Sequence, residues 1–425
     1  MGMSSILIKE SLIGGATQDL LIVDNRIDKI GTDLLPIDED TIILDGRDKA
    51  VVPGLCNGHT HCAMTLFRGY GDDLPLQTWL EDYIWPVEAH MTEEDIYVGA
   101  LLGCVEMIQS GTTCFLDMYT APEATARAVL ETGIRANLSY TLFDRGDAER
   151  AQLDRDNCYR YEQLFAELPE RIGWSVGPHA IYTVSGDQLH FAKEFAEEHE
   201  IPIHLHLSET EREVKDCIAE HGTTPVRYLE QIDALSSRCI MAHSLWLDDE
   251  ELDILARHGC TLVHNPASNM KLASGGRFRY EEMKERGIPV AIGTDGCSSS
   301  NDLDMYIAMR MASLLGKVWR YDPTAVCAPD IYRSATEVGY AMLGLKGGRI
   351  EEGYLADLCL IDLKAPSMVP CHNLTSNLVY AGSSTIVSTT IVDGAILMRD
   401  REIVGMERII EMARRTAHDL LHRKG

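Results

Sequence analysis

The 425-residue sequence lacks any apolar run that approaches the ~20 residues needed for a helix to cross a bilayer. It also lacks a block of basic residues, and its formal net charge of −28 repels phosphate backbones. The amino terminus, MGMSSILIKE, shows no charged-then-apolar signal pattern. These absences argue against a membrane or nucleic-acid partner and predict a cytoplasmic protein.

Paired cysteine motifs are missing as well. None of the 12 cysteines forms a C-x-x-C pair, which argues against a cysteine zinc knuckle and a dithiol redox motif. We therefore expect free thiols in a reducing compartment. Low-complexity tracts are absent, and 45% hydrophobic against 24% charged residues is typical of a globular enzyme. The length suits one large barrel plus an appendage.

The two ends of the chain have β character. DLLIVDNRIDKIG and TIILDGRDKAVVPG are each predicted to be a strand–turn–strand unit, with an Asp-Asn and an Asp-Gly turn. Near the other end, IVSTTIVDGAIL is predicted to be a hairpin, and MERIIEMARRTAHDLLHRKG a terminal amphipathic helix. We expect residues 1–53 and 352–425 to meet in one small β-sandwich.

Between these ends, strands alternate with helices. TTCFLDMY is a candidate strand, and APEATARAVLETG is a candidate helix that ends at Gly133. A long series of such units implies a parallel sheet with helices outside it. We therefore predict an α/β protein whose residues 54–351 close into a (β/α)₈ TIM barrel.

A histidine pair follows the first predicted barrel strand, in the segment GLCNGHTHCA. His59 and His61 are two residues apart, so in a strand they point to the same side. Barrel enzymes keep their chemistry at this carboxyl end of the strands. Two imidazoles at one point suit a metal such as Zn²⁺, although an isolated H-x-H is most often incidental.

Later strands end in further metal-binding or acid–base residues. IPIHLHLSE, CIMAHSL and PVAIGTDG contribute His204, His206, Glu209, His243 and Asp295. Each alone fits a hydrogen-bonded core histidine or a helix-capping aspartate. Their recurrence on separate strands instead favours one site. Three imidazoles and one carboxylate would hold a divalent ion with room for water, namely those of His59, His61, His206 and Asp295.

Several motifs resemble the amidohydrolase superfamily in order and spacing: VVPGLCNGHTH, HLHLSE, MAHS, HNPASNMKL and GTDG. GRIEEGYLADLCLIDL resembles the segment in which its barrel returns to the β-sandwich. More narrowly, NGHTHCAMTLFRGYGDDLPLQTWLEDYIWPVEAHMT and GPHAIYT resemble the methylthioadenosine/S-adenosylhomocysteine deaminases. The resemblance covers nearly the whole chain and implies the same four metal ligands.

The resemblance also implies a single metal ion. Two-metal relatives carry a carbamylated lysine between the two histidine sets, but here that strand ends in GPHAIY, with His179 and no lysine. One ion per subunit is expected, Zn²⁺ in the first place, with Fe²⁺ or Mn²⁺ as alternatives. The family further implies a small-molecule nucleoside substrate and a homo-oligomer, for which we expect a tetramer.

The implied reaction is hydrolytic deamination at adenine C6, which gives the inosine analogue and ammonia. The expected substrates are 5′-deoxyadenosine, methylthioadenosine, S-adenosylhomocysteine and adenosine, in nucleoside and methionine salvage. The metal lowers the pKa of its water. Asp295 and His243 would orient and deprotonate this water, while Glu209 would protonate the ring nitrogen and then the departing amine.

Substrate contacts are expected from Glu88, His179, Glu209 and Asp295. Glu88 would hold the ribose hydroxyls, although a helix residue facing solvent is the plainer alternative. Trp79 and Leu80 would cover the purine, unless Trp79 belongs to the core. The segment LASGGRF lacks the strand and Lys-Ser/Thr context of a phosphate loop, so we expect a flexible loop over the site.

Two residues bear on the 5′ substituent of the expected substrate. Relatives that accept S-adenosylhomocysteine often carry an arginine on the third barrel strand, where this chain has Tyr140, with Arg145 five residues later. This favours a small uncharged tail.

The alternative functions are a guanine- or cytosine-type deaminase, a triazine-type hydrolase, and a non-catalytic barrel. Glu88 favours a nucleoside, and Glu209 favours deamination because departing chloride needs no proton. No expected ligand is missing, which argues against a non-catalytic barrel.

Overall fold

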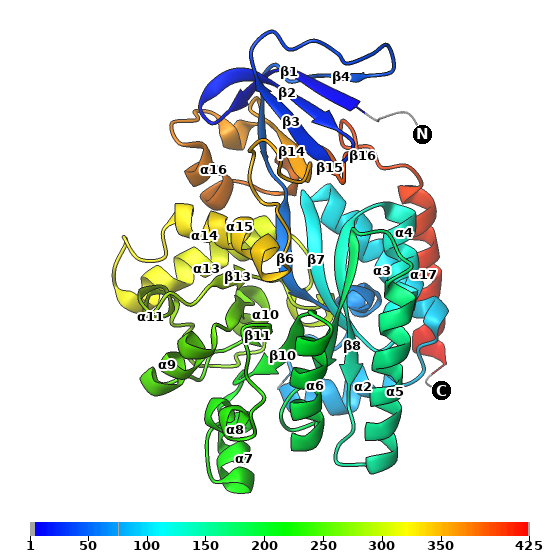
Figure 1. The fold of residues 1–425 in the computed structure, drawn as a ribbon, viewed down its shortest axis with the longest axis vertical. Coiled ribbons are helices and arrows are strands. Elements are labelled where there is room, and N and C mark those ends of the chain that lie inside the picture. The colour runs from blue at the N-terminus through cyan, green and yellow to red at the C-terminus, as the bar shows by residue number, and fades with distance from the viewer. Residues whose placement is uncertain (1–4, 75, 424–425) are drawn as a thin grey trace.

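The computed structural model describes residues 5–74 and 76–423, which form a barrel with a smaller sheet at one end (Figure 1). The barrel sheet holds eight parallel strands in sequence order. They are β6 (Leu55–Thr60), β7 (Thr112–Tyr119), β8 (Arg135–Leu142), β9 (Ile172–Pro178), β10 (Ile203–Leu207), β11 (Cys239–His243), β12 (Thr261–His264) and β13 (Val290–Ile292). The predicted fold class is confirmed.

The first and last barrel strands meet at Gly58. A Cβ added to Gly58 would lie 3.0 Å from the carbonyl oxygen of Ile292. Just beyond the strands, the backbone N–H of Asp295 donates to the carbonyl of His59 over 2.9 Å. Glycine therefore permits the close approach that closes the barrel.

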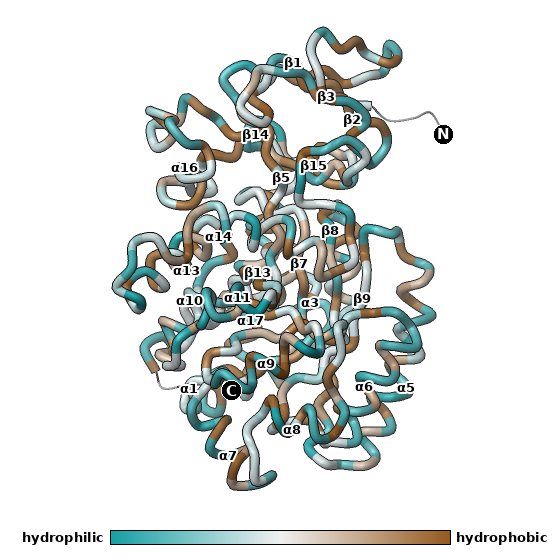
Figure 2. Tube along the Cα trace, turned by 60° about the vertical axis from the view of Figure 1, so that its left-hand side comes forward, coloured by the Kyte–Doolittle hydropathy of each residue, from teal (hydrophilic) through white to brown (hydrophobic). Residues whose placement is uncertain are grey.

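Helices cover the outside of the barrel, so its strands are buried on both faces. All eight residues of β7 and all eight of β8 are buried. The principal helices are α3 (Glu93–Gln109), α4 (Pro122–Thr132), α5 (Ala148–Phe165), α6 (Gly186–Glu198), α7 (Glu211–His221), α8 (Pro225–Gln231), α9 (Asp249–His258), α10 (Pro266–Lys271), α11 (Tyr280–Glu285), α13 (Met305–Arg320), α14 (Ala328–Ser334) and α15 (Glu337–Met342). Helix α4 ends at Gly133 in the left-handed conformation, as predicted. Figure 2 shows polar and apolar residues alternating along α5 and α6, as expected of helices with one face on the barrel.

Strands from both chain ends build the second sheet. They are β1 (Ser5–Ile13), β2 (Ala16–Val23), β3 (Arg26–Gly31), β4 (Ile42–Asp45), β5 (Lys49–Pro53), β14 (Leu358–Asp362), β15 (Val387–Val392) and β16 (Ala395–Met398). Antiparallel pairing of β5 with β14 joins the two ends, and β15 with β16 forms the predicted hairpin. This sheet has its own core, in which Ile8, Leu20 and Ile22 pack with Leu358 and Leu360.

The segment TIILDGRDKAVVPG forms both predicted strands but not the expected hairpin. Strands β4 and β5 each pair in parallel with β1. Between them, the N–H of Gly46 donates to the carbonyl of Lys9 over 2.7 Å, and a Cβ at Gly46 would lie 2.5 Å from that oxygen. The Asp-Gly turn therefore carries the chain onward alongside β1 instead of reversing it.

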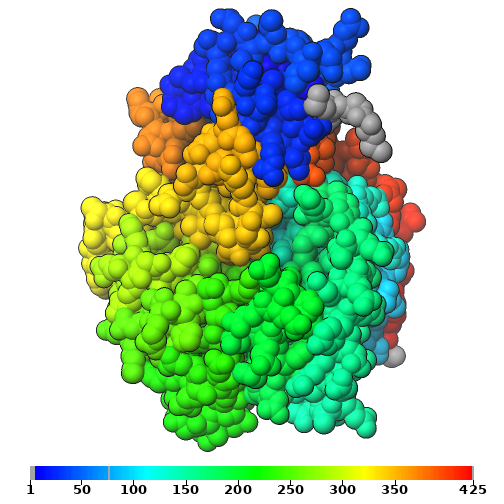
Figure 3. All heavy atoms as spheres, viewed as in Figure 1, coloured from blue at the N-terminus to red at the C-terminus, as the bar shows by residue number. Residues whose placement is uncertain are grey.

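The last helix, α17 (Met406–His422), lies against barrel helix α3 (Figure 1). Arg423 pairs with Asp95 near the start of α3, with 2.6 Å between Nη1 and Oδ2. Figure 3 shows the amino-terminal strands as a cap on the barrel, with the segment just before β14 between the two. No helix in the described part of the chain is long and apolar enough to span a membrane.

Candidate active site

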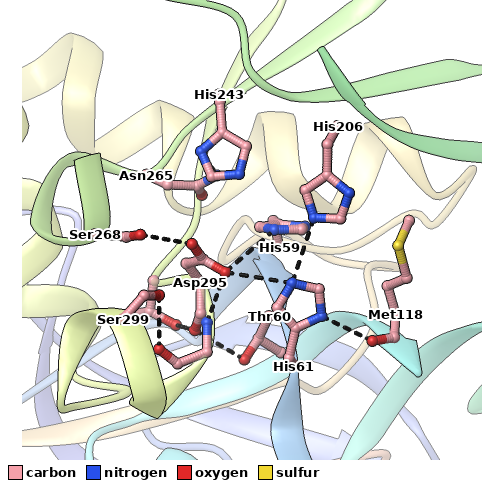
Figure 4. A network of polar contacts seen from close by, with 12 residues as sticks. His59, Thr60, His61, Met118, His206, His243, Asn265, Ser268, Asp295 and Ser299 are labelled. Atoms are coloured by element: carbon pink, nitrogen blue, oxygen red, sulfur yellow. Dashed lines mark hydrogen bonds and ion pairs between the residues drawn. The ribbon is translucent and has the colours of Figure 1, made fainter. Parts of the chain in front are cut away.

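The predicted site residues meet at the carboxyl end of the barrel. His59 lies on β6 and His61 directly follows it, His206 is on β10, His243 ends β11, and Asp295 follows β13. Figure 4 shows their side chains converging on one point. His243 and Asp295 have positive φ values of 70° and 64°, an uncommon backbone state that is concentrated at functional sites.

Nitrogen and oxygen donor atoms of the predicted ligands lie close together at this point. Oδ1 of Asp295 lies 3.5 Å from His59 Nε2 and 3.4 Å from His61 Nε2, and His61 Nε2 lies 3.3 Å from His206 Nε2. An ion with tetrahedral ligands at about 2.1 Å has donor atoms about 3.4 Å apart. Three of the distances among the four predicted donors therefore match one ion. Donor atoms within 4.8 Å of one another group His59 with His61 and Asp295, and also with His206 and His243, so the ligand set stays a prediction.

The hydrogen bonds of the ring nitrogens support this fit. His61 Nδ1 lies 2.8 Å from the carbonyl of Met118, and His206 Nδ1 lies 2.7 Å from the carbonyl of His179. Because a carbonyl only accepts, both Nδ1 atoms carry protons, and both Nε2 atoms direct lone pairs into the site. The buried Nε2 of His59 has no hydrogen-bond partner among the described residues. Facing lone pairs are stabilised by a cation between them.

The charge state of the cluster also suits a divalent cation. Burial lowers the pKa of His59 to about 4 and holds the pKa of His206 well below its ordinary value. Burial alone would raise the pKa of Asp295, but the hydrogen bond and charge of His59 hold it well below its usual range. At neutral pH, His59 and His206 are thus neutral imidazoles and Asp295 is a carboxylate. Ser268 Oγ fixes this carboxylate by donating to Oδ2 over 2.6 Å.

A cavity of about 860 Å³ opens beside the four donors. Its lining includes every predicted substrate contact and proton carrier: Trp79, Leu80, Glu88, His179, Glu209, His243 and Asp295. Leu272, at the start of the predicted loop LASGGRF, also lines it. The residues predicted as substrate contacts and proton carriers therefore line one cavity, and their roles stay predictions.

Glu209 is placed as a proton carrier. Its Oε2 lies 3.7 Å from His243 Nε2, and its Oε1 accepts from Ser274 Oγ over 3.2 Å. Burial raises the pKa of Glu209 above its ordinary value, so its carboxyl holds a proton more tightly than a solvated glutamate does. Its backbone N–H donates to Glu213 Oε2 over 2.8 Å, so a second buried carboxylate holds the segment in place.

Glu88 and His179 are held at the cavity wall by neighbouring side chains. Tyr119 donates its hydroxyl hydrogen to Glu88 Oε1 over 2.7 Å, and burial raises the pKa of Glu88. His179 Nδ1 lies 2.9 Å from Thr183 Oγ1, and burial lowers the pKa of His179 to about 3. Glu88 is therefore not the solvated helix residue of the alternative interpretation.

The structure removes the basis of the prediction that used Tyr140. The Tyr140 side chain is buried and donates its hydroxyl hydrogen to Asp154 Oδ1 over 2.8 Å, and it is not among the described residues lining the cavity. Two arginines line the cavity instead, Arg145 and Arg150. Arg145 lies over the Phe143 ring at 4.8 Å. Tyr140 is therefore not placed to contact a substrate in this cavity.

Sequence reasoning missed several residues that support the site. Asn269 Nδ2 lies 2.9 Å from His243 Nδ1, and Ser268 binds Asp295. Both belong to HNPASNMKL, a motif that contributed to the resemblance without being given a role. Arg150 lies in the first turn of α5, away from the strand ends, and no sequence signal marked it.

Comparisons with known proteins agree with this geometry. Residues 50–397 match the model of the amidohydrolase family. A 5′-deoxyadenosine deaminase of Methanoregula boonei is 45% identical over 99% of this chain and 96% of its own length. A 5-methylthioadenosine/S-adenosylhomocysteine deaminase of Archaeoglobus fulgidus is 44% identical over 96% of this chain and 99% of its own. A zinc-bound adenosine deaminase of Xanthomonas campestris superposes with a TM-score of 0.92 at 31% identity, over 99% of each chain. The chain thus belongs to the amidohydrolase family.

Proposed function

We propose that this protein is a metal-dependent hydrolase that deaminates adenine C6 in 5′-modified adenosines, releasing ammonia and the inosine analogue. One observation carries the proposal: the predicted ligands His61, His206 and Asp295 line one cavity of about 860 Å³ together with Glu209 and Glu88. The names of the relatives above give adenosine, 5′-deoxyadenosine, methylthioadenosine or S-adenosylhomocysteine as their substrates. 5′-Deoxyadenosine is the substrate we place first.

One ion per subunit would be held by His59, His61, His206 and Asp295, and we propose Zn²⁺. Nitrogen-rich donors with near-tetrahedral spacing suit zinc, and the Xanthomonas campestris relative has bound zinc. Fe²⁺ and Mn²⁺ are the alternatives for this ligand set. The ion would supply a water of low pKa as the nucleophile.

The chain's own residues would move the protons. Ionised Asp295 would accept a proton from the attacking water, while His243, held by Asn269, would orient that water. Glu209, with its raised pKa, would donate a proton to the ring nitrogen next to C6 and then carry one to the departing amine. This protonation would make C6 electrophilic. The water oxygen would bond to C6 and the C6–N bond would break. Of the two water protons, one would leave with ammonia and the other would restore the proton on Glu209.

The nucleoside would lie between the metal ligands and the Glu88 wall. The Glu88 carboxylate would accept hydrogen bonds from the ribose hydroxyls, His179 would contact the nucleoside, and Trp79 with Leu80 would cover the purine. Arg145 and Arg150 lie on the same cavity and could bind the carboxylate of S-adenosylhomocysteine. The arginines therefore keep a carboxylate-bearing tail among the proposed substrates.

Ammonia release from a matched panel tests the function. The panel holds adenosine, 5′-deoxyadenosine, methylthioadenosine, S-adenosylhomocysteine, guanine and cytosine, each with and without a chelator. Chelator-sensitive release from the adenosines supports the proposal. Release from guanine or cytosine alone would place the protein among base deaminases. Chloride release from a chlorinated triazine in a parallel assay, with no ammonia from the panel, would favour the dechlorinating alternative.

Three further predictions of the sequence are also proposals. Residues 54–351 would form the catalytic domain, with residues 1–53 and 352–425 as the accessory domain. The family resemblance supports a homo-oligomer, for which we propose a tetramer, and free thiols support a cytoplasmic location. Sedimentation velocity would measure the assembly, and a mass of one chain or of two would contradict the tetramer.

A further inference from the structure

His204 lies beneath the candidate metal centre and has no part in the mechanism above. It precedes the proposed ligand His206 by two residues on β10, so both side chains point to the same side of the strand. The residue is fully buried. A buried histidine in a barrel interior is ordinarily a hydrogen-bonded core residue, so its partners decide whether it does more.

The partners of His204 form a chain that starts at a proposed metal ligand. His204 Nε2 lies 2.8 Å from His59 Nδ1, and His204 Nδ1 lies 3.0 Å from Ser139 Oγ. Ser139 Oγ in turn lies 2.7 Å from Ser175 Oγ. All four residues are buried, so bulk water does not compete for these hydrogen bonds.

His59 differs from the other two imidazole donors in what holds its Nδ1. Backbone carbonyls bind Nδ1 of His61 and of His206, and a carbonyl can only accept a hydrogen bond. An imidazole nitrogen can accept or donate. The proton position in His204 therefore decides which nitrogen of His59 is free to bind a metal.

Only one arrangement lets His59 present a lone pair on Nε2. Its Nδ1–H must donate to His204 Nε2, which leaves the His204 proton on Nδ1. That proton can be donated to Ser139 Oγ, and the backbone carbonyl of Asp117 is a further acceptor beside this ring. The hydroxyl hydrogen of Ser139 can in turn be donated to Ser175 Oγ. The reverse arrangement would place a proton on Nε2 of neutral His59, between that ring and Asp295.

We propose that His204 is a positioning residue for the metal centre: with Ser139, it fixes His59 in the tautomer and orientation that offer Nε2 to the ion. This inference rests on the metal-binding part of the proposed function and not on the identity of the substrate. Hydrogen bonds to the second nitrogen of a metal-binding histidine orient the ring and raise its basicity.

Zinc affinity of purified variants tests the proposal. His204→Leu removes the acceptor, whereas His204→Gln keeps a carboxamide oxygen to accept from His59 Nδ1–H and an amide hydrogen for Ser139. His264→Leu is the matched control, since His264 is a buried strand-end histidine that stacks on Phe278 at 4.0 Å. The zinc dissociation constant is measured by chelator competition, together with the Tm of the metal-free protein.

The proposal expects His204→Leu to weaken zinc binding by about 10- to 100-fold. His204→Gln should recover most of that loss, and Ser139→Ala should weaken binding in the same direction by less. The Co²⁺-loaded His204→Leu protein should show an altered absorption spectrum. His264→Leu should change the metal-free Tm without changing zinc affinity.

Equal zinc affinity in folded His204→Leu and the parent protein would overturn the proposal. So would His204→Gln binding zinc as weakly as His204→Leu, or His264→Leu causing the same loss. If His204→Leu does not fold, His204→Gln and Ser139→Ala test the proposal in its place. An unchanged zinc affinity and an unchanged Co²⁺ spectrum in Ser139→Ala would contradict the chain of hydrogen bonds. Failure of the substrate panel with intact zinc effects would overturn the proposed substrate and leave this inference standing.

Discussion

Replacing Glu209 with glutamine removes a titratable proton while changing little of the site's shape. The glutamine oxygen can still accept from Ser274 Oγ, which lies 3.2 Å from Glu209 Oε1. The backbone of residue 209 remains bound to Glu213 over 2.8 Å. None of the four proposed metal ligands is altered. Metal content and nucleoside binding should therefore be preserved.

The expected loss is in the chemical step. Positioned general acids and bases contribute about 10²- to 10⁴-fold, so kcat should fall by at least about 100-fold. This corresponds to about 2.7 kcal/mol of transition-state stabilisation, or more. KM should stay within a few-fold of the parent value, because the carboxamide keeps the volume and one acceptor of the carboxyl.

Steady-state ammonia release from 5′-deoxyadenosine measures kcat and KM, with zinc content determined on the same sample. Glu251→Gln is the matched control, because Glu251 is a buried carboxylate at the start of α9 that caps the helix through Asp248. The control should retain its activity. A Glu209→Gln protein with kcat within tenfold of the parent would refute Glu209 as the proton carrier.

Three other changes test separate parts of the site. His61→Ala removes one Nε2 donor, so dialysed protein should hold clearly less than one zinc per chain by elemental analysis, and retained stoichiometric zinc would contradict the ligand set. Glu88→Gln should lower kcat/KM for nucleosides by about 10-fold or more, as expected for a lost charged hydrogen bond. Any activity on a free base should not change, and equal losses on both would refute the ribose contact. Burial raises the pKa of Glu213 from 4.5 to about 7, so the folded state holds this proton more tightly than the unfolded chain. The parent should therefore lose up to about 3 kcal/mol of stability relative to Glu213→Gln as pH rises through that window. Parallel urea-unfolding profiles of the two proteins from pH 4.5 to 7 would contradict this.

The four candidate ligands could be predicted from the sequence because each lies at or just after the end of an apolar strand. The strand ends of a parallel barrel meet at one rim, so local pattern was enough to bring His59, His206 and Asp295 together. Glu209 followed for the same reason, since it lies three residues beyond His206.

Residues that act through contacts between distant elements could not be predicted this way. Arg150 reaches the cavity from a helix, and His204 meets His59 only when β10 and β6 lie in the same barrel. The burial of Tyr140 away from the cavity could not be predicted, because strand position alone does not give the partner of a side chain. Its hydroxyl binds Asp154 on α5, a contact set by how that helix packs.

The pairing of β4 and β5 also could not be predicted from the local sequence. An Asp-Gly pair between two apolar runs usually indicates a hairpin, and both runs did become strands. The outcome was decided by β1, whose backbone carbonyl at Lys9 binds the N–H of Gly46. A partner strand more than thirty residues earlier in the chain is not visible in the local pattern.

The central claim is that one divalent ion in this cavity supports hydrolytic deamination of a 5′-modified adenosine. The most direct test titrates metal-free protein with zinc while mass spectrometry follows the conversion of 5′-deoxyadenosine to 5′-deoxyinosine. The account predicts that the rate of 5′-deoxyinosine formation rises linearly with added zinc and stops rising at one equivalent of zinc per chain. No 5′-deoxyinosine at any zinc ratio, or a break at two equivalents, would contradict it.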